Sequence, residues 1–103
     1  MGLNCEPIYT ITTLRGTIHN GIRCVGFTHE LETAIEMVED NAMDINENGY
    51  YHFAVIEKVL PGIYNIELDH IWFKWRKDKE GGPGYVRIDK PDQFKRICGF
   101  GIG

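Results

Sequence analysis

Aromatic and cationic side chains in the second half of the chain are the strongest candidates for chemistry. Trp72 and Tyr85 carry rings that can stack on a planar group, and the lysines and arginines near them in sequence can neutralise phosphates or carboxylates. This combination predicts a site for a small anionic or nucleotide-like ligand. The predicted ligand-binding residues are Trp72, Tyr85, Lys74, Arg76, Arg87 and His52.

Residue patterns typical of catalysis or metal binding are absent from the sequence. The four histidines show neither the HxH nor the HExxH spacing that zinc sites use. The sequence also lacks a P-loop, a GxSxG nucleophile elbow and kinase motifs. We therefore predict no metal, no other cofactor and no enzymatic activity. A small nucleotide-processing hydrolase that uses His52 or His70 is the alternative.

Runs of β-branched and aromatic residues predict several short strands. Turn signals separate them, among them Asn20-Gly21, Pro61-Gly62 and the glycine-rich residues 81–84. Consecutive strands joined by turns pair in antiparallel fashion. The predicted strands cover residues 8–14, 23–27, 50–60, 69–76 and 85–88.

One amphipathic helix is predicted over residues 29–41. Thr28 is the predicted N-cap, and acidic residues in the first turn favour the positive end of the helix dipole. Apolar residues recur at spacings of three and four, which gives the helix one buried stripe. The stripe consists of Leu31, Ala34, Ile35, Val38 and Ala42.

These elements predict an α+β fold, a single antiparallel sheet of four to five strands with one amphipathic helix packed on one face. With 103 residues and no linker, the chain is expected to form one domain over residues 1–103. Alternation along the strands assigns the more apolar residues to the face that the helix covers. These residues are Tyr51, Phe53, Val55 and Val59, together with Ile71, Phe73 and Trp75.

The opposite face of the sheet is then expected to be uncovered, aromatic and basic. An open apolar face marks an interaction surface. Two interpretations remain open, burial of this face in a homo-oligomer and a ligand site, and a pocket between subunits satisfies both. The residues expected on this face are His52, Ala54, Ile56, Lys58, His70, Trp72, Lys74, Arg76, Tyr85 and Arg87.

Charge is unevenly distributed along the chain, although the net charge is only −4. Residues 24–57 contain eight acidic residues and no lysine or arginine, whereas residues 58–103 contain nine basic and six acidic residues. The overall acidity argues against binding of a long nucleic acid. The locally basic strands are nevertheless compatible with a small anionic ligand.

Three further features predict a cytoplasmic protein. No apolar run approaches the roughly 20 residues needed to cross a bilayer, so no membrane partner is expected. Residues 1–6 lack the basic and apolar regions of a signal peptide. The three cysteines form no CxxC pair and their number is odd, which favours a reducing compartment. A Cys5–Cys98 link is the alternative.

Several motifs together resemble an uncharacterised family of small phage- and prophage-type bacterial proteins. The motifs are Arg23-Cys24-Val25-Gly26-Phe27, Ala54-Val55-Ile56-Glu57, Pro61-Gly62-Ile63-Tyr64, Trp72-Phe73-Lys74-Trp75 and the C-terminal Gly99-Phe100-Gly101-Ile102-Gly103. The resemblance covers most of residues 23–103. It implies a small accessory protein in the cytoplasm of a bacterial host, acting on host defence, and it supplies no established activity or functional residues.

The open face, the lack of catalytic motifs and the resemblance lead to one functional prediction. We expect a non-enzymatic, homo-oligomeric binding protein that sequesters a nucleotide-like or other anionic host signal molecule, or that blocks a host defence protein. Besides the hydrolase, a second alternative is a protein–protein adaptor that docks through its acidic helix, where Glu36 and Glu39 lie.

Overall fold

The computed structural model describes residues 7–15, 21–59 and 67–94. The Cys5–Cys98 link, the Pro61-Gly62 turn and the C-terminal glycine motif lie outside these residues. The described part forms five strands, one α-helix and two short 3-10 helices. In chain order they are β1 (Ile8–Leu14), β2 (Ile22–Thr28), α1 (Leu31–Glu39), η1 (Ala42–Asp44), β3 (Phe53–Val59), β4 (Glu67–Arg76), β5 (Gly84–Ile88) and η2 (Asp92–Phe94).

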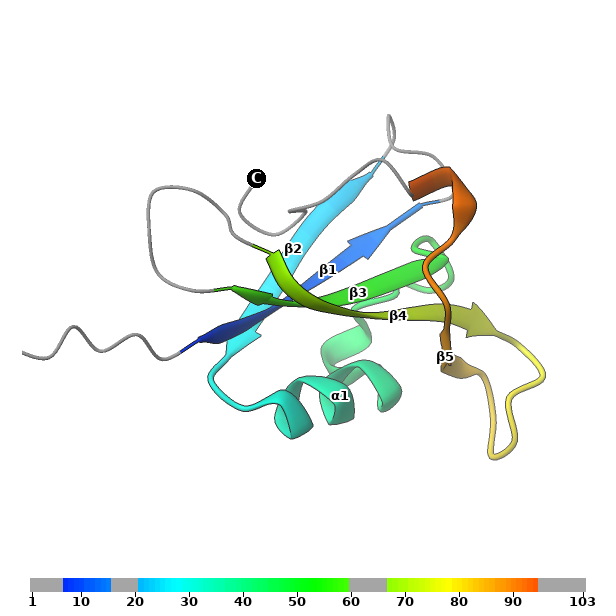
Figure 1. Cartoon of the computed structure of the whole chain (residues 1–103). Coiled ribbons are helices and arrows are strands. Elements are labelled where there is room, and N and C mark those ends of the chain that lie inside the picture. Colours follow the sequence, from blue (N-terminus) through cyan, green and yellow to red (C-terminus); the bar gives the residue numbers. More distant parts are fainter. Residues whose placement is uncertain (1–6, 16–20, 60–66, 95–103) are drawn as a thin grey trace, which may run out of the picture.

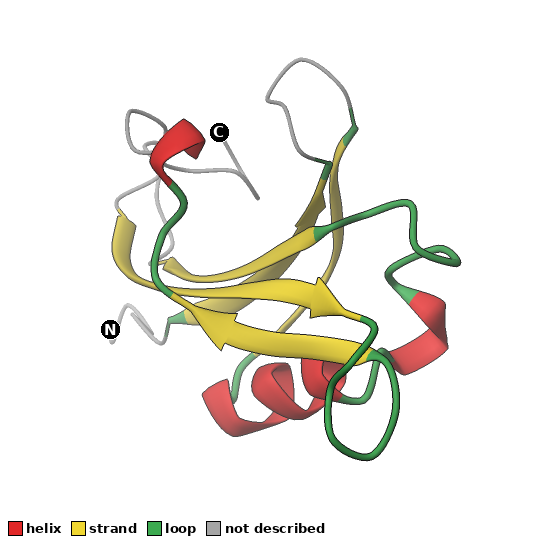
Figure 2. Cartoon of the chain, turned by 90° about the vertical axis from the view of Figure 1, so that its right-hand side faces the viewer, coloured by secondary structure: helices red, strands yellow, loops and turns green. Residues whose placement is uncertain are grey.

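The five strands form one antiparallel sheet in the order β2-β1-β3-β4-β5. β3 therefore lies at the centre, and β2 and β5 form the two edges. The helix α1 packs on one face of the sheet, whereas η2 lies on the other side (Figures 1 and 2). This arrangement confirms the predicted α+β fold with one antiparallel sheet and one helix on one face.

The helix is shorter than the sequence predicts. It ends at Glu39 rather than residue 41, because Asn41 adopts the left-handed backbone conformation, with φ 48°, that commonly terminates helices. Its N-cap is Glu30 instead of Thr28. The Thr28 Oγ1 accepts a hydrogen bond from the Glu30 N–H at 3.3 Å, so this threonine shapes the turn that leads into the helix.

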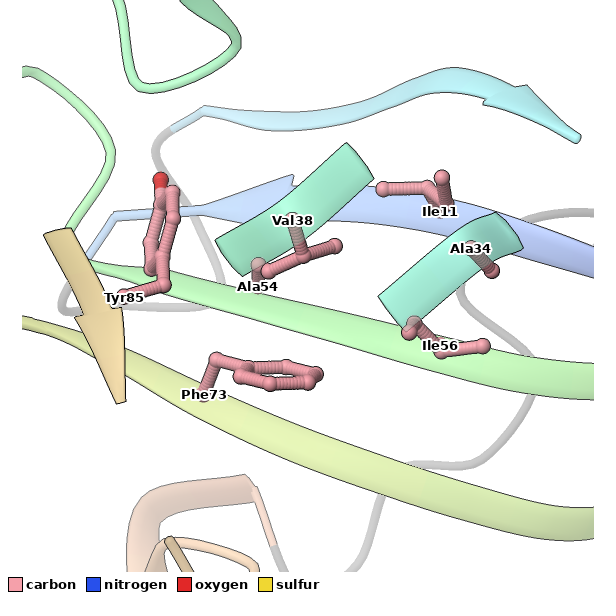
Figure 3. Close-up of a cluster of buried hydrophobic side chains, with 7 residues drawn as sticks. All are labelled: Ile11, Ala34, Val38, Ala54, Ile56, Phe73 and Tyr85. Carbon is pink, nitrogen blue, oxygen red and sulfur yellow. The ribbon is translucent and has the colours of Figure 1, made fainter. Parts of the chain in front are cut away.

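The main hydrophobic core fills the space between α1 and the sheet (Figure 3). Ala34 and Val38 of the helix point toward the strands and are fully buried. A helix of nine residues is marginal on its own in water, so α1 depends on this packing for its stability. The strands contribute Ile11, Ala54, Ile56, Phe73 and Tyr85 to the cluster.

The predicted faces are right for β4. Phe73 is fully buried in the cluster under α1, and Ile71 and Trp75 pack at the border of that cluster. Trp72, between Ile71 and Phe73 in the sequence, lies on the opposite face as predicted and packs in a second cluster. Polar residues alternate with apolar ones along this strand, so the apolar side was readable from the sequence.

The predicted faces are wrong for β3. Ala54 and Ile56 lie on the side of α1, whereas Phe53 and Val55 pack on the other side of the sheet. Val59 follows a register shift in the pairing of β3 with β4, so simple alternation does not extend to it. The error has a physical cause, because β3 is buried on both faces and relative apolarity cannot identify which face the helix covers.

The second face of the sheet is also covered, which corrects the prediction of an open face. Trp72 is only 3% exposed, and its ring stacks on that of Phe94 with centroids 5.3 Å apart. Phe53 meets Phe94 edge-on at 5.5 Å, and Leu14 and Val55 complete this cluster. The prediction assumed that one helix covers only one face and that nothing covers the other. The chain after β5 turns toward this second face and supplies Phe94 (Figure 1).

Tyr85 ties β5 to the segment that precedes β3. Its hydroxyl donates a hydrogen bond of 2.8 Å to the carbonyl of Tyr51. Tyr51 was predicted to lie within a strand, on the side that the helix covers, but it precedes β3. The Asn46 side-chain amide donates to the same carbonyl at 3.4 Å. Burial raises the pKa of the Tyr85 phenol well above its ordinary value near 10, since the charged form loses its hydration.

This raised pKa predicts a loss of stability in alkali. Above pH 10 the unfolded chain ionises at Tyr85 while the folded chain does not, so the free energy of unfolding falls by up to about 1.4 kcal/mol per pH unit. Tyr85→Phe removes this contribution and costs about 1 kcal/mol at neutral pH, because Asn46 still serves the Tyr51 carbonyl.

Urea unfolding of both proteins between about pH 8 and pH 11 measures the difference. The remaining tyrosines are common to both proteins and cancel in the comparison. Equal slopes of unfolding free energy against pH in the two proteins would contradict the assignment.

Candidate functional site

The predicted ligand-binding residues are divided between the two faces of the sheet. Trp72 and Lys74 share the second face with Arg76 by the alternation of β4. Tyr85 and Arg87 lie on the face of α1, because they pair with Trp75 and Phe73 respectively. The prediction that Tyr85 and Arg87 join Trp72 on one surface is therefore wrong. It failed because the relative register of β4 and β5 is not encoded in the alternation of either strand.

The two predicted stacking rings are core side chains in this structure. Trp72 stacks on Phe94, and Tyr85 is fully buried with its hydroxyl hydrogen-bonded. The cationic residues Lys74, Arg76 and Arg87 are exposed. His52 is also exposed and precedes β3, and its carbonyl accepts a hydrogen bond from the Trp75 N–H at 2.8 Å.

A groove on the α1 side of the sheet brings two cations together over an apolar floor. The β1–β3 register sets Tyr9 beside Lys58, and the β3–β4 register sets Ile56 beside Ile71. The groove has a volume of about 270 Å³ and begins where the helix begins. It is lined by Tyr9, Leu31, Ile56, Lys58, His70, Ile71 and Arg87. We call it the Lys58–Arg87 groove.

The groove continues past the end of β5. Strand β5 stops at Ile88, which pairs with Trp72, so β4 runs on without a neighbour on that side among the described residues. A second hollow of about 260 Å³ lies there and shares His70, Ile71 and Arg87 with the first. It adds Asp89 and Lys90 to the lining.

The electrostatics of the Lys58–Arg87 groove favour an anion. Among the side chains that the structure describes, its lining contains two permanent cations and no carboxylate. Neither Lys58 nor Arg87 forms an ion pair with another residue that the structure describes. A bound anion would therefore gain charge-assisted hydrogen bonds without first breaking an ion pair. The apolar floor of Ile56 and Ile71, with the Tyr9 ring, suits a ligand that also carries an apolar or planar part.

Sequence reasoning found only part of this groove. It grouped Ile56, Lys58 and Arg87 but placed them with Trp72 on the face opposite the helix, whereas they lie on the side of α1. It also missed Tyr9 and Leu31. These two come from β1 and from the start of α1, and only long-range strand pairing brings them to Lys58. Within residues 7–15, 21–59 and 67–94, no group of three or more His, Cys, Asp or Glu residues is placed to hold a metal ion.

The chain matches no protein-family model, no curated protein and no solved structure. The resemblance to phage- and prophage-type proteins therefore depends on the quoted motifs alone. No helix in the described part of the chain is long and apolar enough to cross a membrane.

The position of Trp72 predicts a structural effect for its removal. Trp72→Ala should lower the free energy of unfolding by about 3–5 kcal/mol, because it deletes a buried ring and leaves Phe94 without its stacking partner. The exposed neighbour Lys74 provides the control, and Lys74→Ala should change stability by less than about 0.5 kcal/mol. Chemical denaturation measures both, and a Trp72→Ala protein as stable as the Lys74→Ala protein would show that Trp72 is no core residue.

Proposed function

We propose that this protein binds a small anionic ligand in the Lys58–Arg87 groove and does not transform it. The observation that carries the proposal is a pair of cations above an apolar floor that have no ion-pair partner in the described part of the chain. The volume of about 270 Å³ is near the lower end of the range of ligand pockets, roughly 300–1,000 Å³. This size suits a mononucleotide or a compact organic phosphate or carboxylate.

The biological setting of the proposal comes from the sequence resemblance. We propose a phage- or prophage-type protein that acts in the cytoplasm of its bacterial host and withdraws an anionic host signal molecule. Binding without turnover removes such a signal in proportion to the amount of protein present. A homo-oligomer is part of this proposal, since groups of a second subunit would enclose a groove that is open to solvent.

The second candidate function is a nucleotide-processing hydrolase. His70 lines both hollows, and its ring lies on the second face of the sheet, 6.5 Å from that of Trp72. A histidine at the border of an anion site is a group that can move a proton. This observation favours His70 over His52, because His52 lines neither hollow. The two candidates differ in the fate of the ligand: a sequestering protein returns it intact after denaturation, and a hydrolase returns product.

A thermal-shift and calorimetric panel tests the proposal. The probes are inorganic phosphate, benzoate, adenosine monophosphate, a cyclic mononucleotide and ADP-ribose, each at low ionic strength. At least one should bind, and its affinity should fall as salt is added, because ions screen an exposed electrostatic contact. The absence of binding by every probe would overturn the proposal, and recovery of product would replace it with the hydrolase.

Two matched double variants locate the site. Lys58→Gln with Arg87→Gln should weaken binding by about 100-fold, because each cation is expected to supply one charge-assisted hydrogen bond worth about tenfold. Lys74→Gln with Arg76→Gln removes the same charge from exposed positions outside the groove and should change affinity by less than about threefold. The reverse result would place the ligand on the second face, as the sequence prediction did.

A further inference from the structure

A second groove lies at the other end of α1, between the edge strand β2 and the segment that follows the helix. Its volume is about 600 Å³, more than twice that of the Lys58–Arg87 groove. Three large apolar side chains in its lining are strongly exposed: Phe27 by 61%, Met37 by 38% and Met43 completely. We call it the methionine groove.

The exposure of these three side chains does not stabilise the fold. Exposed methionine forgoes the free energy that burial of its side chain would give. Met43 also holds a left-handed backbone conformation, with φ 53°, which costs a residue other than glycine about 1–3 kcal/mol. A partner that covers Met37 and Met43 would recover the burial energy, and methionine side chains adapt easily to the shape of what covers them.

The backbone of β2 offers a second means of recognition. β2 pairs with β1 on one side and lies at the edge of the sheet, and no other described strand pairs with its second side. An extended peptide can add to such an edge as a further antiparallel or parallel strand. Val25 and Phe27 of β2 line the methionine groove, so the side chains of an added strand would lie beside it.

Charge determines what kind of peptide fits. Among the described residues, Asp44, Glu47 and one cation, Arg23, line the groove, and the Arg23 Nη1 pairs with the Glu47 Oε2 at 2.7 Å. The nearby C-terminal end of α1 carries Glu39 and Asp40 and has no basic residue in its last turn. Helix C-termini bear a partial negative charge, so these acidic residues are in an unfavourable field. The Lys79 Nζ donates a hydrogen bond to the Glu39 carbonyl at 3.4 Å. One lysine does not offset two carboxylates and the helix end, so a further cation from outside would relieve the field.

We infer that the methionine groove and the edge of β2 bind a basic segment of a partner protein in extended conformation. The backbone of the segment pairs with β2, its apolar side chains contact Phe27, Met37 and Met43, and its lysines or arginines face Asp44 and the C-terminal end of α1. This surface is separate from the Lys58–Arg87 groove, so it does not depend on the proposed ligand.

A synthetic nonapeptide in which lysine alternates with valine is the probe. Fluorescence anisotropy of the labelled peptide should report saturable binding to the whole protein at low salt. Two reference peptides define the chemistry: in one threonine replaces every valine, and in the other glutamate replaces every lysine. Both should bind at least tenfold more weakly. The first lacks apolar anchors, and the second carries glutamates that Asp44 and the acidic C-terminal end of α1 repel.

Substitutions on the protein locate the peptide. Met37→Ser with Met43→Ser leaves every charge in place and should weaken binding of the lysine–valine peptide by about tenfold. Tyr50→Ser is the matched control, since Tyr50 is 45% exposed and lies outside the groove lining, and its effect should stay below twofold. Bound peptide should also slow hydrogen exchange of the β2 amides.

Three results would overturn the inference. The first is equal binding of the lysine–valine and lysine–threonine peptides, which would mean that charge alone attracts them. The second is unchanged affinity in the double methionine variant. The third is concentration-dependent self-association in light scattering that the double methionine variant abolishes, because the groove would then be covered by a second copy of the chain.

Discussion

The arrangement of the molecule depends on the burial of β3 from both sides. Its first five residues, from Phe53 to Glu57, are all buried, with α1 on one face and Phe94 on the other. A central strand in this position contributes apolar contacts to two layers at once. The consequence is that the middle of the sheet offers no surface to a ligand. Accessible sites are confined to the ends and edges of the sheet, and Lys58 is the first residue of β3 after the buried run.

The same constraint explains which parts of the fold were predictable. Strands and helix were found because turn residues, β-branched runs and the helical stripe are local signals. The face of a strand is readable only where one side is polar, as on β4. On β3 the two sides are equally apolar, since Phe53 and Val55 are no less hydrophobic than Ala54 and Ile56. The covering of the second face by Phe94 depends on the path of the chain after β5, which no local pattern encodes.

For the same reasons, the sequence predicted only part of the Lys58–Arg87 groove. The alternation of β3 put Lys58 and Ile56 on the same face as each other, but that face was predicted to lie opposite the helix and lies on the side of α1. Tyr9 and Leu31 are distant from Lys58 in sequence, and they reach it through the pairing of β1 with β3 and the docking of α1. Composition showed a basic second half, but it could not show which cations lie without an ion-pair partner among the described residues.

The second face of the sheet is divided into an apolar and a polar half, and this division affects which part of the sheet can open locally. The apolar half is closed by the stack of Trp72 on Phe94. The polar half holds Thr10, Thr12 and Glu57, all buried, and the Oγ1 atoms of both threonines have no hydrogen-bond partner among the residues that the structure describes. Each such atom costs about 1–3 kcal/mol. The polar half also coincides with the part of β4 that extends beyond β5. Buried hydroxyls without a partner among the described residues lower the local stability of a sheet. The end of the sheet beside the Lys58–Arg87 groove is therefore the part best able to adjust around a ligand.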